Sequence, residues 1–132
     1  MSGLIPAPAS ALPRVTIVGF ASDATGGTYQ SPVGYSVGSN TERDVEFVVP
    51  AACTLKSLRF VCQELDAGTA QVLKVRLNGA DSTLTHTFPA NTAAGTQAAV
   101  AGELPLVAGD RLAISRSLAL RSFGGSFILE AA

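Results

Sequence analysis

Short runs in which apolar and polar residues alternate recur roughly every ten residues along the chain, a spacing typical of β proteins. In residues 71–77, for example, Leu73 and Val75 share one side of an extended backbone. Lys74 and Arg76 share the other side. Alternation with a period of two predicts a half-buried β-strand. The segments with such patterns are 14–20, 43–49, 54–65, 71–77, 82–88, 111–116, 119–122 and 126–130, with a short ninth strand near 33–37.

Turn-forming residues separate these runs. Asn78-Gly79 stands between two of them and is typical of a two-residue hairpin turn. Residues 92–103 are rich in alanine and fit either a weak strand or a short helical turn. Lys56 departs from the pattern, because it falls on the side of segment 54–65 that is otherwise apolar.

No run has the 3.6-residue period of an amphipathic helix, so the pattern predicts an all-β protein. Eight or nine short strands at this spacing form an antiparallel sandwich or a barrel. Residues 14–132 are expected to form a single domain, since the sequence shows no internal repeat. Residues 1–13 contain three prolines and no charged side chain, which predicts an extended N-terminal arm.

The composition is that of a folded globular protein. Of the 132 residues, 47% are apolar and 14% are charged, and the net charge is −1. The nine basic residues are scattered, whereas binding to phosphates needs clustered Lys and Arg, so we expect no nucleic-acid partner. No apolar stretch reaches the ~20 residues of a membrane span, and no secretory signal is evident. We therefore expect synthesis in the cytoplasm and no membrane partner.

The two cysteines are expected to be free thiols. Cys53 and Cys62 flank a segment without turn-forming residues, and nine residues of extended chain span about 30 Å. That is far beyond the roughly 6 Å between the Cα atoms of a disulfide. Both residues are interpreted as small apolar side chains of the core.

Candidate catalytic residues are few. Gly34-x-Ser36-x-Gly38 matches the pattern of a serine-hydrolase elbow, but that site needs a helix directly after the serine, and no helical pattern follows. His86 is the only histidine and lies in a predicted strand, where we expect it at the edge of the core. The acidic and sulfur-containing residues lack the spacing of zinc or calcium ligands. We therefore expect no catalytic residue, no cofactor and no metal ion.

Lys74 and Arg76 are the main candidates for a charged surface. Two basic residues on one side of a strand are most often a solvated face. The alternative is a basic patch that contacts an acidic surface on a partner.

Two stretches of the sequence resemble a known group of proteins. Residues 72–88 run strand, Asn-Gly turn, strand, and residues 103–115 hold an Ala-Gly-Asp turn before an alternating strand. Together they resemble jelly-roll domains of tailed-bacteriophage structural proteins, notably capsid decoration (cementing) proteins and some fibre or spike heads. The Ala-Gly-Asp element is also similar to a turn in trimeric C1q- and TNF-like jelly rolls. The absence of a collagen-like repeat favours the phage proteins.

The resemblance covers about residues 45–130. It implies a jelly-roll sandwich that self-associates, as a trimer in preference to a dimer, and it implies no active site. The leading hypothesis is therefore a viral structural protein on the outer surface of a phage capsid, which stabilises the icosahedral head by bridging neighbouring major-capsid subunits. One alternative is the receptor- or glycan-binding head of a phage fibre or spike. Another is a small hydrolase that uses Ser36.

The arm is the candidate partner-binding segment. Its apolar side chains stand among prolines, and apolar surface gains about 25 cal/mol per Å² on burial. Prolines also lower the conformational entropy lost when the arm becomes ordered. The residues expected to contact another subunit are Leu4, Ile5, Pro6, Leu12 and Pro13.

Overall fold

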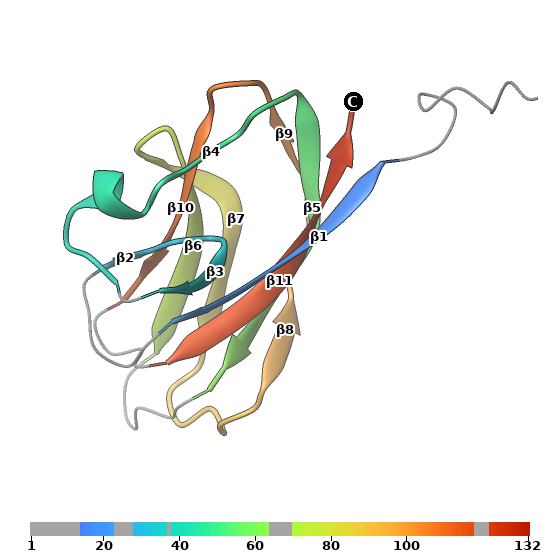
Figure 1. Ribbon diagram of the computed structural model, residues 1–132. Helices are drawn as coiled ribbons and strands as arrows, with labels where there is room; N and C mark the ends of the chain where they lie inside the picture. The colour runs from blue at the N-terminus through green and yellow to red at the C-terminus, as the bar shows by residue number, and fades with distance from the viewer. Residues whose placement is uncertain (1–13, 23–27, 37, 64–69, 118–121) are drawn as a thin grey trace, which may run out of the picture.

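Two β-sheets pack face to face in the computed structural model, which describes residues 14–22, 28–36, 38–63, 70–117 and 122–132 (Figure 1). In the first sheet the central strands are β1 (Val15–Ser22), β11 (Phe123–Ala131) and β5 (Cys53–Cys62). The short β3 (Gly34–Ser36) flanks β1, and β8 (Gln97–Ala99) and β9 (Leu104–Leu106) both pair with β5.

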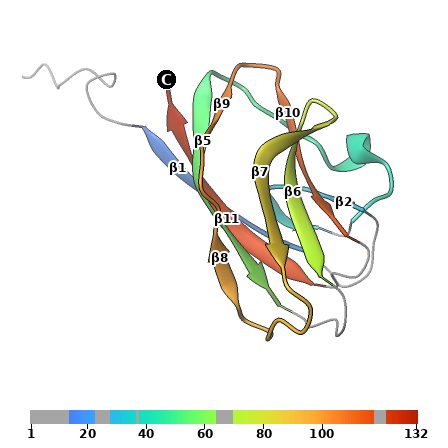
Figure 2. The ribbon, with the colours of Figure 1, turned by 180° about the vertical axis from the view of Figure 1, so that it is seen from behind.

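In the second sheet, β10 (Arg111–Arg116) lies beside β6 (Gln71–Leu77), and β6 lies beside β7 (Ala80–Phe88). Two short strands, β2 (Tyr29–Gln30) and β4 (Phe47–Val48), pair with opposite ends of β10. Figure 2 shows β6 and β7 in front of the first sheet.

The strand order is that of a jelly roll. β8 with β9, and β2 with β4, each occupy one position in the order, so the strands other than the short edge strand β3 fill eight positions. Across the first sheet the positions then run in the order first, eighth, third and sixth. Across the second sheet they run second, seventh, fourth and fifth. This is the double Greek-key arrangement of jelly rolls. The predicted all-β sandwich of jelly-roll type is therefore confirmed.

The core lies between the sheets and is built around a phenylalanine cluster. The ring of Phe20 lies 6.0–6.3 Å from the rings of Phe60, Phe123 and Phe127. Those three side chains are almost fully buried. Leucines and Ile114 of the second sheet complete the core, so both sheets contribute to one apolar layer.

The hairpin of β6 and β7 follows the sequence pattern closely. β6 has the predicted bounds, and Leu73 and Val75 are buried as expected. Asn78 and Gly79 have φ angles of 53° and 81°, which are the left-handed values of a two-residue hairpin turn.

The predicted strand 43–49 is wrong. Residues Glu42–Val45 form one turn of 3₁₀ helix, and only Phe47–Val48 is a strand. Val45 and Val49 are nevertheless buried. A 3₁₀ turn therefore buries the same apolar residues that a strand with alternating sides would bury. An ion pair of Glu42, described below, ties this turn to the second sheet.

Lys56 is displaced by a β-bulge. Ser57 has a φ angle of 55°, and Ser57 and Leu58 together stand opposite one residue of β11, Phe127. The extra residue shifts the alternation, so Lys56 faces outward while Leu58 is buried.

Several other boundaries differ from the sequence prediction. Segment 54–65 becomes β5, 14–20 extends as β1 to Ser22, and the last strand begins at Phe123 rather than at 126. The ambiguous region 92–103 contains β8. The predicted arm 1–13 lies outside the described residues, as does most of the predicted strand 119–122.

Candidate functional site

The residues expected to bind a partner all fall in the arm. Leu4, Ile5, Pro6, Leu12 and Pro13 lie outside the described residues, so the structure does not place them. The candidate surfaces therefore come from the two sheets, whose outward faces differ in chemistry.

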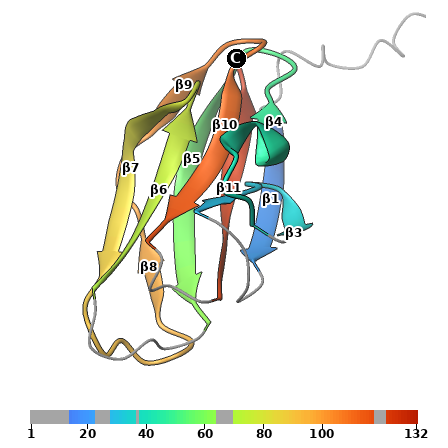
Figure 3. The ribbon, with the colours of Figure 1, turned by 90° about the vertical axis from the view of Figure 1, so that its left-hand side faces the viewer.

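Ser36 and His86 lie far apart. Ser36 belongs to β3 at one end of the sandwich, and His86 belongs to β7 at the other, as Figure 3 shows for the two strands. Ser36 stands in a strand that pairs in parallel with β1, rather than at a turn from strand to helix. His86 is half-buried with its ring against Phe88, 4.6 Å between centroids. The fold therefore does not bring these two residues together.

Cys53 and Cys62 mark the two ends of β5, and no disulfide joins them. Cys62 is fully buried. Burial, together with the nearby carboxylate of Asp110, raises the pKa of the Cys53 thiol. A raised pKa reduces the thiolate fraction, so Cys53 is a weak nucleophile at neutral pH.

Arg76 is the centre of a charged network on the second sheet. Its guanidinium donates two hydrogen bonds to Glu42, from Nε to Oε2 at 2.8 Å and from Nη2 to Oε1 at 3.2 Å. It donates two more, to Asp81 Oδ1 at 2.7 Å and to the Gly79 carbonyl at 2.6 Å. Its Cζ also lies 5.6 Å from the centre of the Tyr29 ring.

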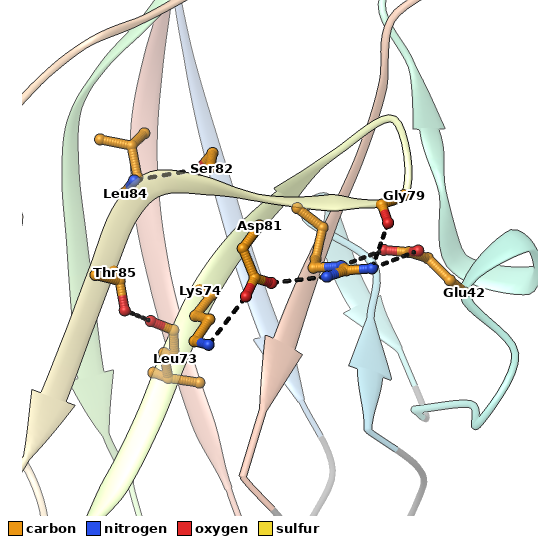
Figure 4. Close-up of polar contacts among 9 residues, drawn as sticks. Glu42, Leu73, Lys74, Gly79, Asp81, Ser82, Leu84 and Thr85 are labelled. Carbon is orange, nitrogen blue, oxygen red and sulfur yellow. Dashed lines mark hydrogen bonds and ion pairs between the residues drawn. The ribbon is translucent and has the colours of Figure 1, made fainter.

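Lys74 completes this network. Its Nζ lies 3.0 Å from Asp81 Oδ2, an ion pair drawn in Figure 4. The two cations thus have carboxylate partners within the chain, which leaves less positive charge for an acidic partner. Two donated hydrogen bonds, first from Arg76 and then from Lys74, hold the pKa of Asp81 below its ordinary value.

We call the outward side of these strands the β6–β7 face. It consists of charged residues, threonines and Val72, which alternate with the buried side chains of the core. Its members are Val72, Lys74, Arg76, Asp81, Thr83, Thr85 and Thr87.

The outward side of the first sheet has no such network. Val18 and Phe20 of β1 pack inward, so the residues between and before them face out. Ile17 is 78% exposed and Val15 is 48% exposed. We call this surface the β1–β11 face, and its members are Val15, Ile17, Gly19, Ala21, Gly124, Ser126, Ile128 and Glu130.

The cross-strand register explains how the β1–β11 face is formed. Ile17 stands opposite Ile128, and Gly19 stands opposite Ser126. Of these eight residues only Glu130, which stands opposite Val15, carries a charge. Lys56 of the neighbouring β5 pairs with it, 2.9 Å between Nζ and Oε2. The result is an outward surface of aliphatic and small side chains with one paired carboxylate beside Val15.

Small residues also leave a hollow beside this face. It has a volume of about 330 Å³, and Arg59, Val61, Gln97 and Ser126 form its rim. Phe20 lies at its base, where Gly125 has no side chain to cover the ring. The surface thus offers a depression next to exposed aliphatic groups.

Sequence reasoning did not single out the β1–β11 face. One signal was present: β1 is apolar on both sides, with Val15 and Ile17 on one and Val18 and Phe20 on the other. A strand that is apolar on both sides is typical of one that is covered on both faces.

A second, polar hollow lies beside the network of Arg76. Its volume is about 550 Å³, and both acidic and basic side chains line it, including Glu42, Glu46 and Arg111. Tyr29 adds an aromatic ring. Such mixed chemistry suits a polar ligand better than an apolar one.

Among the described residues, no three His, Cys, Asp or Glu side chains gather closely enough to hold a metal ion. In that part of the chain no helix has the length and apolar character to cross a bilayer. A comparison with protein-family models and a search of curated proteins found no match to this chain.

Proposed function

We propose that this protein is a decoration protein of a tailed-phage capsid, which stabilises the icosahedral head by bridging neighbouring major-capsid subunits. The observation that carries the proposal is the β1–β11 face. A monomer that exposes Val15 and Ile17 on a face whose one carboxylate, Glu130, is already paired with Lys56 has a surface suited to burial against another protein. The jelly-roll order and the sequence resemblance support the same class of protein.

The mechanism is linkage between binding and assembly. A protein that contacts two neighbouring subunits binds the assembled lattice more tightly than the separated subunits, so it stabilises the lattice by mass action. A rigid sandwich suits this role, because little conformational entropy is lost when a preformed surface binds. The arm 1–13 adds a second contact, and two linked contacts increase the overall affinity.

Cosedimentation with empty shells, assembled from the major capsid protein encoded by the same genome, tests the proposal. We expect the wild-type chain to sediment with the shells and to raise the temperature at which they disassemble. Val15→Glu should weaken binding at least tenfold, because it places a charge in the apolar contact. Val107→Glu is the matched control, since Val107 is also exposed but lies outside this face.

Two results would contradict the proposal: no binding of the wild-type chain to intact shells, or equal loss of binding in both variants. The number of copies per virion separates the alternative. A decoration protein is present at hundreds of copies, whereas a fibre or spike head is present at few. A low copy number would favour the receptor- or glycan-binding head, with the polar hollow near Glu42 as its ligand site.

A further inference from the structure

Half of β1 forms an open edge of the first sheet. β11 borders β1 on one side from Val15 to Ala21. On the other side β3 borders only Phe20–Ser22. Within the described parts of the chain, no strand therefore pairs with the outer side of residues 15–19, which Figure 3 shows at the margin of the sandwich.

The hydrogen-bond pattern shows which backbone groups face this open side. Ala131 N donates to Arg14 O at 2.8 Å, so Arg14 points its backbone groups toward β11. The direction alternates along an antiparallel ladder. Val15, Ile17 and Gly19 therefore point their N–H and C=O groups away from β11, and these groups form the open edge.

The other sheet edges carry features that discourage pairing with another chain. β7 has a bulge opposite Val75, between its partners of Lys74 and Arg76. β8 and β9 are short, and β9 contains Pro105. β2 and β4 have two residues each. Bulges, short strands and prolines are the usual protection of edges.

β1 has none of these features over its open half. The strand Val15–Ser22 contains no charge and no proline, and its register with β11 is unbroken. Its outward side chains include the most exposed large apolar residue of the described chain, Ile17. An unprotected apolar edge of this kind is a template for pairing with another strand.

We propose that two copies of this chain associate through this edge, with their β1 strands antiparallel and Ile17 opposite the partner's Ile17. In this register Val15 stands opposite the partner's Gly19. The three residues of each copy whose backbone groups point to the open edge then stand opposite the same three residues of the other copy. Their N–H and C=O groups can form about six hydrogen bonds. A shift by one residue would place residues whose N–H and C=O groups point toward β11 opposite the partner's edge residues. The alternation of the backbone groups therefore excludes this register.

The side chains fit the same register. Ile17, its partner's equivalent and Ile128 of each β11 form one apolar row across the joined sheets. Val15 packs over the partner's Gly19, where the nearest atom to an added Cβ would be 4.0 Å away, so space is available. In each copy Glu130 stands beside Val15 and stays paired with Lys56, which lies one strand further from the axis.

The symmetry of this contact fixes the number of copies. An edge that pairs with itself is isologous and is used up by one partner, so the assembly closes as a dimer. The resemblance to trimeric jelly rolls implies three copies, and the edge geometry favours two. This inference does not rest on the proposed function, because it concerns two copies of the chain in the absence of any capsid.

The first test is the mass in solution. By sedimentation equilibrium, we expect the wild-type chain to have twice the 13.4 kDa mass of one copy. Ile17→Lys should be monomeric at the same concentrations, since it places two like charges directly opposite each other at the two-fold axis. Val107→Lys should remain dimeric. Circular dichroism checks that both variants keep the β fold. A monomeric or trimeric wild type, or a dimer unaffected by Ile17→Lys, would overturn the proposal.

The second test is cross-linking at the axis. Opposite residues in such a pair have Cα atoms about 5.5 Å apart, a separation within the range of a disulfide. Ile17→Cys should therefore give a disulfide-linked dimer under mild oxidation, and Val107→Cys should not. The wild-type chain measures any contribution of Cys53 and Cys62. Equal cross-linking of the two variants would show that the β1 edges do not meet. The two proposals can fail separately. A wild-type chain that is dimeric but does not bind capsid shells would contradict the proposed function and leave the dimer in place.

Discussion

The side chains on the outward faces of the two sheets differ in whether they find interaction partners within the chain. On the β6–β7 face, Arg76 and Lys74 have carboxylate partners in the chain, and the threonines are solvated. On the β1–β11 face, Val15 and Ile17 remain exposed, since no other described residue covers them. The first face thus completes its interactions within one copy of the chain. The second gains free energy only when another molecule buries it.

This difference between the two faces indicates that exposed apolar surface, rather than charge, marks the proposed interface of this protein. Charged residues drew attention in the sequence, and the structure shows that they hold a turn in place. The uncharged strand β1 attracted no notice as a surface, and it provides both an apolar face and an open edge. A self-paired charge network stabilises the fold, whereas an unpaired apolar strand provides a contact for a partner.

The largest effect is expected from the inward side of the first sheet. A Cβ at Gly125 would overlap Arg59 O and lie 2.6 Å from the Phe20 ring, so Gly125→Ala must displace a strand or the ring. We expect a loss of about 3 kcal/mol in the free energy of unfolding, measured with urea. Gly19→Ala, on the outward side of the same sheet, should change stability by less than about 1 kcal/mol. Equal losses would mean that the two sides are equally packed.

A smaller effect should separate the two outward faces. Arg76→Ala breaks a fork to Glu42 in which both side chains are at most 17% exposed, and we expect a loss of about 2 kcal/mol in unfolding free energy. Ile17→Ala should stay within about 0.5 kcal/mol when measured on the monomer, because Ile17 has few contacts to lose. Arg76→Lys keeps the charge without the fork and should recover only part of the stability. If Ile17→Ala cost as much as Arg76→Ala, the comparison of the faces would fail.

The smallest effect is a pH dependence confined to the β6–β7 face. The pKa of Asp81 is lowered, so its contribution to stability is present above the ordinary pKa of about 4. That contribution is lost as the pH falls through the lower, folded value. Asp81→Asn should therefore reduce the loss of unfolding free energy below about pH 4, only slightly because the carboxylate is 46% exposed. Glu103→Gln controls for the removal of one carboxylate, and an unchanged slope in Asp81→Asn would contradict the assignment.

Much of the fold could be predicted because local rules decide it. The Asn78-Gly79 turn and the alternation in 71–77 define a hairpin without reference to the rest of the chain. The strand 43–49 could not be predicted correctly, because buried Val45 and Val49 satisfy a turn as well as a strand. The bulge at Ser57 was marked only by the misplaced Lys56, since one extra residue exchanges the two sides of a strand.

The surfaces were less predictable than the fold. The partner of Arg76 is Glu42, which lies in a distant turn, and no periodic pattern connects the two. The open edge of β1 depends on β3 being short and on which strands neighbour β1, which follows from strand order rather than from local pattern. The apolar character of both sides of β1 was visible in the sequence, but its exposure was not.

The pairing of Val15 with Glu130 has a consequence for synthesis of the protein. Ribosomes add about 5–20 residues per second, so β1 emerges roughly 6–20 s before its neighbour β11. During that interval the edge of β1 that pairs with β11 lacks its native partner, whereas the partner of the other edge, β3, is synthesised soon after β1. β1 is therefore the segment of the nascent chain with the longest exposure to wrong pairing, and a strong candidate for chaperone contact.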